Sequence, residues 1–102
     1  MPDDAAFRLA CARNELAMVQ ASYTPELARS QDGAGQQPMH YSCFGGALAV
    51  ARWLHEKGVP LDVATNGGGQ PMHAACEGGH LEVARGLHEQ GVPPDAADNT
   101  AR

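Results

Sequence analysis

The chain has 102 residues, a length that fits one domain. Its 12 Gly and 7 Pro exclude long helices, coiled coils and membrane spans, and a formal net charge of −5 argues against a nucleic acid as partner. Its Leu, Val and Phe residues number only 16 and it has no Ile, so it is either disordered or built in thin layers rather than around a thick core.

The N-terminus, Met1-Pro2-Asp3-Asp4, has neither the basic segment nor the apolar run of a signal peptide. We therefore expect a cytoplasmic or nuclear protein whose three cysteines are reduced. The two acidic residues favour the start of a helix at this point.

The rest of the sequence repeats itself. A shift of 33 residues lays residues 32–64 onto 65–97 with 20 identical positions and no gap. With a shift of 32 the preceding segment aligns at apolar positions: Cys11 on Cys43, Leu16 on Leu48 and Met18 on Val50. We predict a single domain over residues 1–102, made of a degenerate first copy at 1–31, full copies at 32–64 and 65–97, and the start of a truncated copy at 98–102. Repetition of this kind makes disorder improbable.

Each full copy has the pattern of two short helices and a turn. Pro38 and Pro71 suit the first position of a helix, which then runs to a Gly-Gly pair. A second helix carries Leu, Ala and Leu at spacings of three and ends at Gly58 or Gly91. A turn-rich connector leads to the next copy. Helices this short need neighbours, so we predict a stack of such units.

These copies resemble the ankyrin repeat, whose 33-residue unit is built around T-P-L-H, A-A, G-H-L-E-V-V and G-A-D-V-N segments. The third copy matches it at Pro71-Met72-His73-Ala74-Ala75-Cys76, at Gly79-His80-Leu81-Glu82-Val83-Ala84 and at Gly91-Val92. The resemblance implies an all-α fold, an ankyrin-repeat solenoid of stacked helix-turn-helix units with β-finger turns. It also implies a protein–protein interaction module with no catalysis.

Two departures from the family pattern have physical consequences. Gln37 and Gln70 replace the Thr that would cap each first helix, which weakens capping by about 1 kcal/mol per repeat. Gly86 stands where the second copy has Trp53, so the third copy loses helix propensity and a hole is left. We expect Trp53 to lean toward that hole from the adjacent layer.

The repeated cysteines and histidines could suggest a metal or thiol site. Cys11, Cys43 and Cys76 occupy one repeat position, however, and equivalent positions in stacked layers lie roughly 10 Å apart. That separation is too large for shared zinc coordination or a disulfide, and the resemblance implies a small buried residue at this position. We expect no metal.

Catalysis and cofactor binding also lack support in the sequence. His40 and His73 could act as bases, but no nucleophile or carboxylate recurs beside them, and the resemblance implies that they hold adjacent turns together by hydrogen bonds. Gly67-Gly68-Gly69 lacks the Lys-Ser/Thr of a phosphate-binding loop and fits a turn that needs positive φ. We therefore expect no enzyme, no catalytic residue and no cofactor.

The resemblance places partner binding on the concave surface of finger turns and first helices. The residues at these positions are Ala34, Gln36, Asn66 and Gly67 on the turns and Tyr41, Phe44, Gly45, Ala74, Glu77 and Gly78 on the helices. Tyr41 and Phe44 share a helix face, whereas the third copy has Ala74 and Glu77 there, which indicates an exposed aromatic pair. The alternative is that one of them packs against the first copy.

Two further roles remain open. The segment could be a structural spacer in a longer ankyrin array whose binding residues lie elsewhere, because the turn residues are small. No polar capping copy covers the outer face of the third helix pair. We therefore expect either a fragment of a longer array or a chain whose C-terminal face meets a partner, including a second copy in end-to-end self-association.

Overall fold

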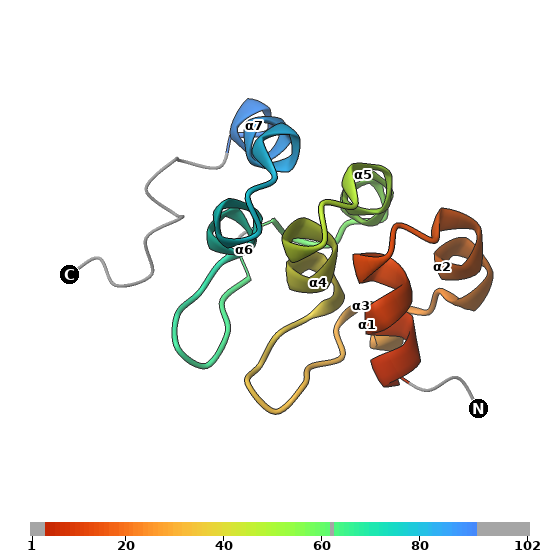
Figure 1. Ribbon diagram of the computed structural model, residues 1–102. Coiled ribbons are helices and arrows are strands. Elements are labelled where there is room, and N and C mark those ends of the chain that lie inside the picture. Colours follow the sequence, from red (N-terminus) through yellow and green to blue (C-terminus); the bar gives the residue numbers. More distant parts are fainter. Residues whose placement is uncertain (1–3, 62, 92–102) are drawn as a thin grey trace.

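The computed structural model describes residues 4–61 and 63–91, and its helices form a row of antiparallel pairs (Figure 1). In chain order the helices are α1 (Asp4–Ala12), α2 (Leu16–Ser22), α3 (Pro25–Ala28), α4 (Pro38–Phe44), α5 (Leu48–Glu56), α6 (Pro71–Glu77) and α7 (Leu81–Glu89). The fourth copy predicted to start at 98–102 lies outside the described residues.

Three helix pairs, α1 with α2, α4 with α5 and α6 with α7, stack one after another. The first helices α1, α4 and α6 lie side by side, and the second helices α2, α5 and α7 form a parallel row beside them (Figure 1). The connectors that precede α4 and α6 project from the side of the first helices as long loops. The predicted all-α solenoid of stacked helix-turn-helix units is therefore confirmed.

The tips of these connectors, residues 32–36 and 65–69, are the finger turns. The ends of each turn are joined by a backbone hydrogen bond, from Asp32 N–H to Gln36 O at 3.0 Å and from Thr65 N–H to Gly69 O at 2.8 Å. Within residues 4–61 and 63–91 no segment is a β-strand. The turns are thus present, but without the β structure that the resemblance implies.

The first helices of the two full copies begin at a proline and end at a glycine, as the sequence predicts. Pro38 and Pro71 are the first residues of α4 and α6, and Gly45 and Gly78 end them. The capping loss expected at Gln37 is partly offset, because His40 Nδ1 accepts a hydrogen bond from the Gln37 backbone N–H at 2.9 Å. No side-chain hydrogen bond from Gln70 caps α6, as the sequence predicts.

The core is a set of thin layers between the helix pairs. Met39, Leu54, Val19 and Val50 are among its largest side chains without solvent contact, and small residues such as Cys11, Cys43 and Ala75 lie between them. Gly45 and Gly78 allow the close approach, since a Cβ at either position would collide with a carbonyl of the preceding layer, that of Ala12 or Phe44. These glycines, which the resemblance assigns to the binding surface, therefore set the spacing between layers.

The expectation for Trp53 is wrong. Its ring lies edge-on to that of Tyr23, with centroids 5.2 Å apart and an angle of 89° between planes. Lys57 Nζ lies 5.2 Å from the centre of the Trp53 ring. Trp53 thus packs toward the preceding layer, where an aromatic partner is available, and the expected hole at Gly86 stays open between α5 and α7.

Within the described part of the chain, no helix combines the length and the apolar character that are needed to cross a bilayer.

Candidate functional site

The finger turns are held by side chains at one repeat position. Asp32 Oδ1 accepts hydrogen bonds from the backbone N–H groups of Ala34 and Gln36, both at 2.9 Å. In the next copy Thr65 Oγ1 accepts one from the Gly69 N–H at 3.0 Å. A short acceptor at the base of each turn satisfies N–H groups that would otherwise need water, so both turns have a fixed shape.

Hydrogen bonds also tie one finger turn to the next. Asn66 donates its backbone N–H to Ala34 O at 3.0 Å and its side-chain amide to Gly33 O at 3.4 Å. Gly68 has φ of 89°, which agrees with the positive φ expected for the glycine triplet. These hydrogen bonds therefore join the two finger turns into one continuous surface beside the first helices.

His40 links helix α4 to the finger turns. Its Nδ1 accepts from Gln37 N–H, so the proton lies on Nε2, which donates to Val63 O at 3.0 Å and Gly69 O at 3.2 Å. Burial lowers the pKa of His40, although these hydrogen bonds act in the opposite direction. The role that the resemblance implies for this histidine, holding adjacent turns together, is confirmed, and both ring nitrogens are engaged.

Tyr41 braces the first finger turn. Its hydroxyl donates to Asp32 Oδ2 at 2.8 Å, and the Arg8 guanidinium lies 5.7 Å from the centre of its ring. Partial burial raises the pKa of Asp32, but hydrogen bonds from Gln36, Tyr41 and Ala34 and the charge of Arg8 lower it overall. Tyr41 is half-buried, so this geometry favours packing against the first copy over free exposure.

Phe44 is different, because 54% of its surface is exposed. It stands in the wall of a groove of about 390 Å³ between α4, α6 and the second finger turn. The groove is lined by Gln36, His40, Phe44, Thr65, Gly69, Gln70, His73, Ala74 and Glu77. Four of the expected contact residues therefore come together here, namely Gln36, Phe44, Ala74 and Glu77.

The other six expected contact residues lie outside the groove, and two of them, Gly45 and Gly78, are the glycines that set the spacing between layers. Ala34, Asn66 and Gly67 are exposed at the tips of the finger turns, and Tyr41 lies beneath the first turn. Sequence reasoning missed the contribution of His73, whose Nε2 lies 3.4 Å from Glu77 Oε2. Their spacing of four residues on a predicted helix is the signal that could have paired them.

The thiols do not form a reactive site. Cys11 and Cys43 are buried, and burial raises the pKa of each to about 12, so they stay protonated at neutral pH. Cys76 is exposed, which corrects the expectation that all three are buried.

In the described residues no further helix pair covers the outer side of α6. Nor do three His, Cys, Asp or Glu side chains of that part gather closely enough to hold a metal ion.

Comparison with known proteins agrees with this architecture. Residues 7–98 match the ankyrin repeat family in three copies. The chain belongs to the ankyrin repeat family. Ankyrin repeats are protein-interaction modules, and the family is in general non-catalytic. A search of curated proteins finds no match to the chain.

A solved structure that this ankyrin-repeat chain resembles is that of Bd0816, a predatory endopeptidase from Bdellovibrio bacteriovorus, in complex with the immunity protein Bd3460. The match to one chain of that complex has a TM-score of 0.77 and 28% sequence identity, and it covers 88% of this chain. It covers 48% of the other chain, so the present sequence spans about half the length of that neighbour.

Proposed function

We propose that the chain binds a protein partner through the concave surface formed by its finger turns and first helices, and that it has no catalytic activity. One observation carries the proposal: the groove between α4 and α6 has an exposed phenyl ring, that of Phe44, in its wall. The residues at the equivalent position of the other two copies are Ala12 and Glu77, so packing between repeats does not require an aromatic residue there.

The rigidity of the surroundings supports this proposal. Hydrogen bonds fix each finger turn and join the two, and His40 ties them to the helices. A surface that is already ordered loses little conformational entropy when a partner docks. The solved complex of an immunity protein with an endopeptidase, in which one chain resembles this one, is consistent with a role in protein binding.

The chemistry of the groove indicates what the partner presents. Phe44 on α4 offers an apolar ring, and on α6 61% of the Glu77 side chain is exposed next to the His73 imidazole. We propose that a partner places an apolar side chain against Phe44 and a cation or hydrogen-bond donor near Glu77. Contacts from Ala34, Asn66 and Gly67 on the turns surround this centre.

The test compares protein capture by matched variants. Immobilised wild-type protein, Phe44→Ala and Met18→Ala are incubated with a lysate of the source organism, and bound proteins are identified by mass spectrometry. Met18 is a suitable control because it is 56% exposed but lies on α2, away from the groove. We expect a protein that wild type and Met18→Ala retain and Phe44→Ala loses. Equal capture by all three variants would place binding elsewhere.

The competing role as a spacer in a longer array rests on a different observation. Leu81 is 69% exposed on α7, whereas Leu48, its equivalent on α5, is half-buried beside the next layer. Cys76 is exposed on α6 of the same helix pair. This apolar end face suits a further repeat or end-to-end contact with a second copy.

Analytical ultracentrifugation tests self-association directly. Association of the wild type that rises with concentration and is lost in Leu81→Lys supports contact through this end face. A monomer at all concentrations contradicts it.

A further inference from the structure

The Trp53 position is filled in one layer of the stack and empty in the next. Between α2 and α5 the indole of Trp53 lies edge-on to Tyr23. Gly86 takes the same repeat position on α7 and has no side chain to fill the equivalent space between α5 and α7. At this repeat position the two layers therefore differ by one indole group.

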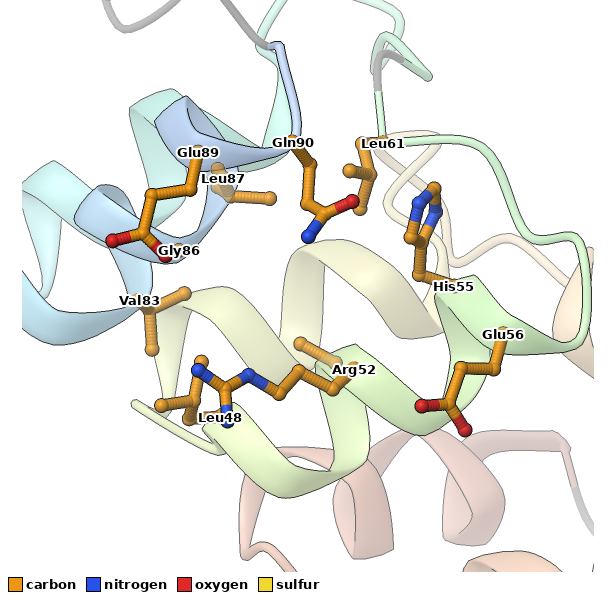
Figure 2. Close-up of a pocket in the computed structure, with 11 residues that line it drawn as sticks. Leu48, Arg52, His55, Glu56, Leu61, Val83, Gly86, Leu87, Glu89 and Gln90 are labelled. Carbon is orange, nitrogen blue, oxygen red and sulfur yellow. The ribbon is translucent and has the colours of Figure 1, made fainter.

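The empty place is a pocket of about 320 Å³, drawn in Figure 2. Leu48, Leu61, Val83 and Leu87 supply apolar side chains to its lining, from α5, α7 and the connector that follows α5. Figure 2 shows Gly86 near Val83 on α7, with Leu48 and Arg52 on the facing helix α5. A hollow of this size lies at the small end of ligand pockets, which span about 300–1000 Å³.

The wall of the pocket contains an aromatic side chain that a bound ring could contact. His55 lies in its wall and occupies the repeat position of Tyr23, the residue whose ring pairs with Trp53. A ring bound next to Gly86 would therefore face an imidazole edge where Trp53 faces a phenol. We propose that this pocket binds a small, uncharged aromatic molecule of about the size of indole.

The charges around the pocket decide between classes of aromatic ligand. Arg52 lies in the lining and can place its guanidinium over a bound ring, as Lys57 Nζ lies 5.2 Å from the centre of the Trp53 ring. Glu56 and Glu89 also belong to the lining and repel a ligand that bears a carboxylate. A neutral aromatic ring with an N–H group can lie against the Arg52 guanidinium and can donate a hydrogen bond to a glutamate, so it is compatible with both charges.

The same side chains favour a free small molecule over a side chain of a bound protein. Arg52, Glu56 and Glu89 are all exposed. They stay hydrated around a small ligand, whereas a docked protein surface would remove their water at a cost in free energy. The pocket lies on the second helices, so it is separate from the groove of the first helices and its test is independent of protein capture.

The experiment is a titration of ¹⁵N-labelled protein with indole, followed by two-dimensional NMR. We expect saturable shifts of the Gly86 N–H and its neighbours in wild type and in the control Met18→Ala. In Gly86→Trp the attached indole fills the pocket, so these shifts should be absent. An added Cβ at Gly86 lies 3.3 Å from the Leu48 Cδ1, so the movable end of that side chain must shift by a few tenths of an ångström to admit the new residue.

A second variant keeps the proposal testable if Gly86→Trp fails to fold. His55→Ala removes the edge partner and should weaken indole binding about threefold to tenfold. Unchanged affinity in His55→Ala, binding of indole by folded Gly86→Trp, or no saturable shift in wild type would each overturn the proposal. Equal affinity for cyclohexanol would refute aromatic selectivity, and tighter binding of a short Trp-containing peptide would refute the free small molecule.

Discussion

Replacement of His40 by Ala should destabilise the protein more than any other single histidine substitution within the described helices of the first two copies. The imidazole is 2% exposed and makes three hydrogen bonds, to Gln37 N–H, Val63 O and Gly69 O. Because the two bonds at Nε2 share one proton, the loss equals about two hydrogen bonds at about 0.5–1.5 kcal/mol each, or about 1–3 kcal/mol. That is a large share of the 5–15 kcal/mol typical of a folded domain.

Urea denaturation followed by circular dichroism measures this loss. His55→Ala is the matched control, because His55 is exposed and its Nδ1 lies 3.5 Å from Val59 O, so we expect a change below about 0.5 kcal/mol. His40→Asn should fall between the two, since the Asn oxygen can accept from Gln37 N–H, whereas its amide N–H group is too close to the backbone to donate to Val63 O as His40 Nε2 does. Equal free energies of unfolding for His40→Ala and His55→Ala would refute the role of His40 as a link between turns.

The burial of His40 also makes the free energy of unfolding depend on pH. Burial lowers the pKa of His40 in the folded state, so below the unfolded value of about 6.5 the unfolded chain binds more protons at this site. The contribution of neutral His40 is complete above that value and is lost as the pH falls through the folded pKa. Between pH 7 and 5 we therefore expect the free energy of unfolding to fall more steeply with decreasing pH in wild type than in His40→Asn. Parallel curves would contradict this.

Three further predictions concern the finger turn, the layer contact and the thiols. Tyr41→Phe removes only the bond to Asp32 and should lower stability by about 1 kcal/mol in urea denaturation, without loss of helical signal. Gly45→Ala should cost about 1–3 kcal/mol because its Cβ meets backbone, whereas Gly33→Ala, with nothing within 4 Å, should be nearly neutral by the same assay. In folded protein iodoacetamide should label Cys76 alone, and mass spectrometry should find the other two cysteines labelled only after denaturation.

Local signals explain why so much of the fold could be predicted. Proline at the first helical position and glycine after the last one set the limits of α4 and α6. The 33-residue period then fixed the order of the layers, because a short helix pair can bury its apolar face only against a neighbouring copy. These are properties of single residues and of spacing, which a sequence displays directly.

The parts that could not be predicted depend on contacts between distant segments. The bond from Tyr41 to Asp32 crosses nine residues, and Arg8 reaches the same ring from the first copy, so spacing on one helix could not show that Tyr41 is engaged. Met18 aligns with buried Val50, yet Met18 is exposed and Val19 is buried in its helix. A degenerate copy at the edge of the stack has no preceding layer among the described residues to cover that position.

Comparison of the two full copies separates what builds the stack from what is particular to this chain. The second copy has three aromatic residues, and the third copy replaces each: Tyr41 by Ala74, Phe44 by Glu77 and Trp53 by Gly86. Substitution at Phe44 and Glu77 shapes the groove, while substitution at Trp53 leaves the pocket beside Gly86.

The proline and methionine that open each first helix are shared by both copies and buried, so they would be needed in any repeat of this stack. A position where the copies differ in size and polarity is free of that requirement. Its side chain therefore reflects a local surface, and both candidate binding sites lie at such positions. The two sites also lie on different rows of helices, so filling the pocket through Gly86→Trp should leave capture of a protein partner through Phe44 unchanged. Loss of capture in that variant, with the fold intact, would show that the two surfaces are coupled through the stack.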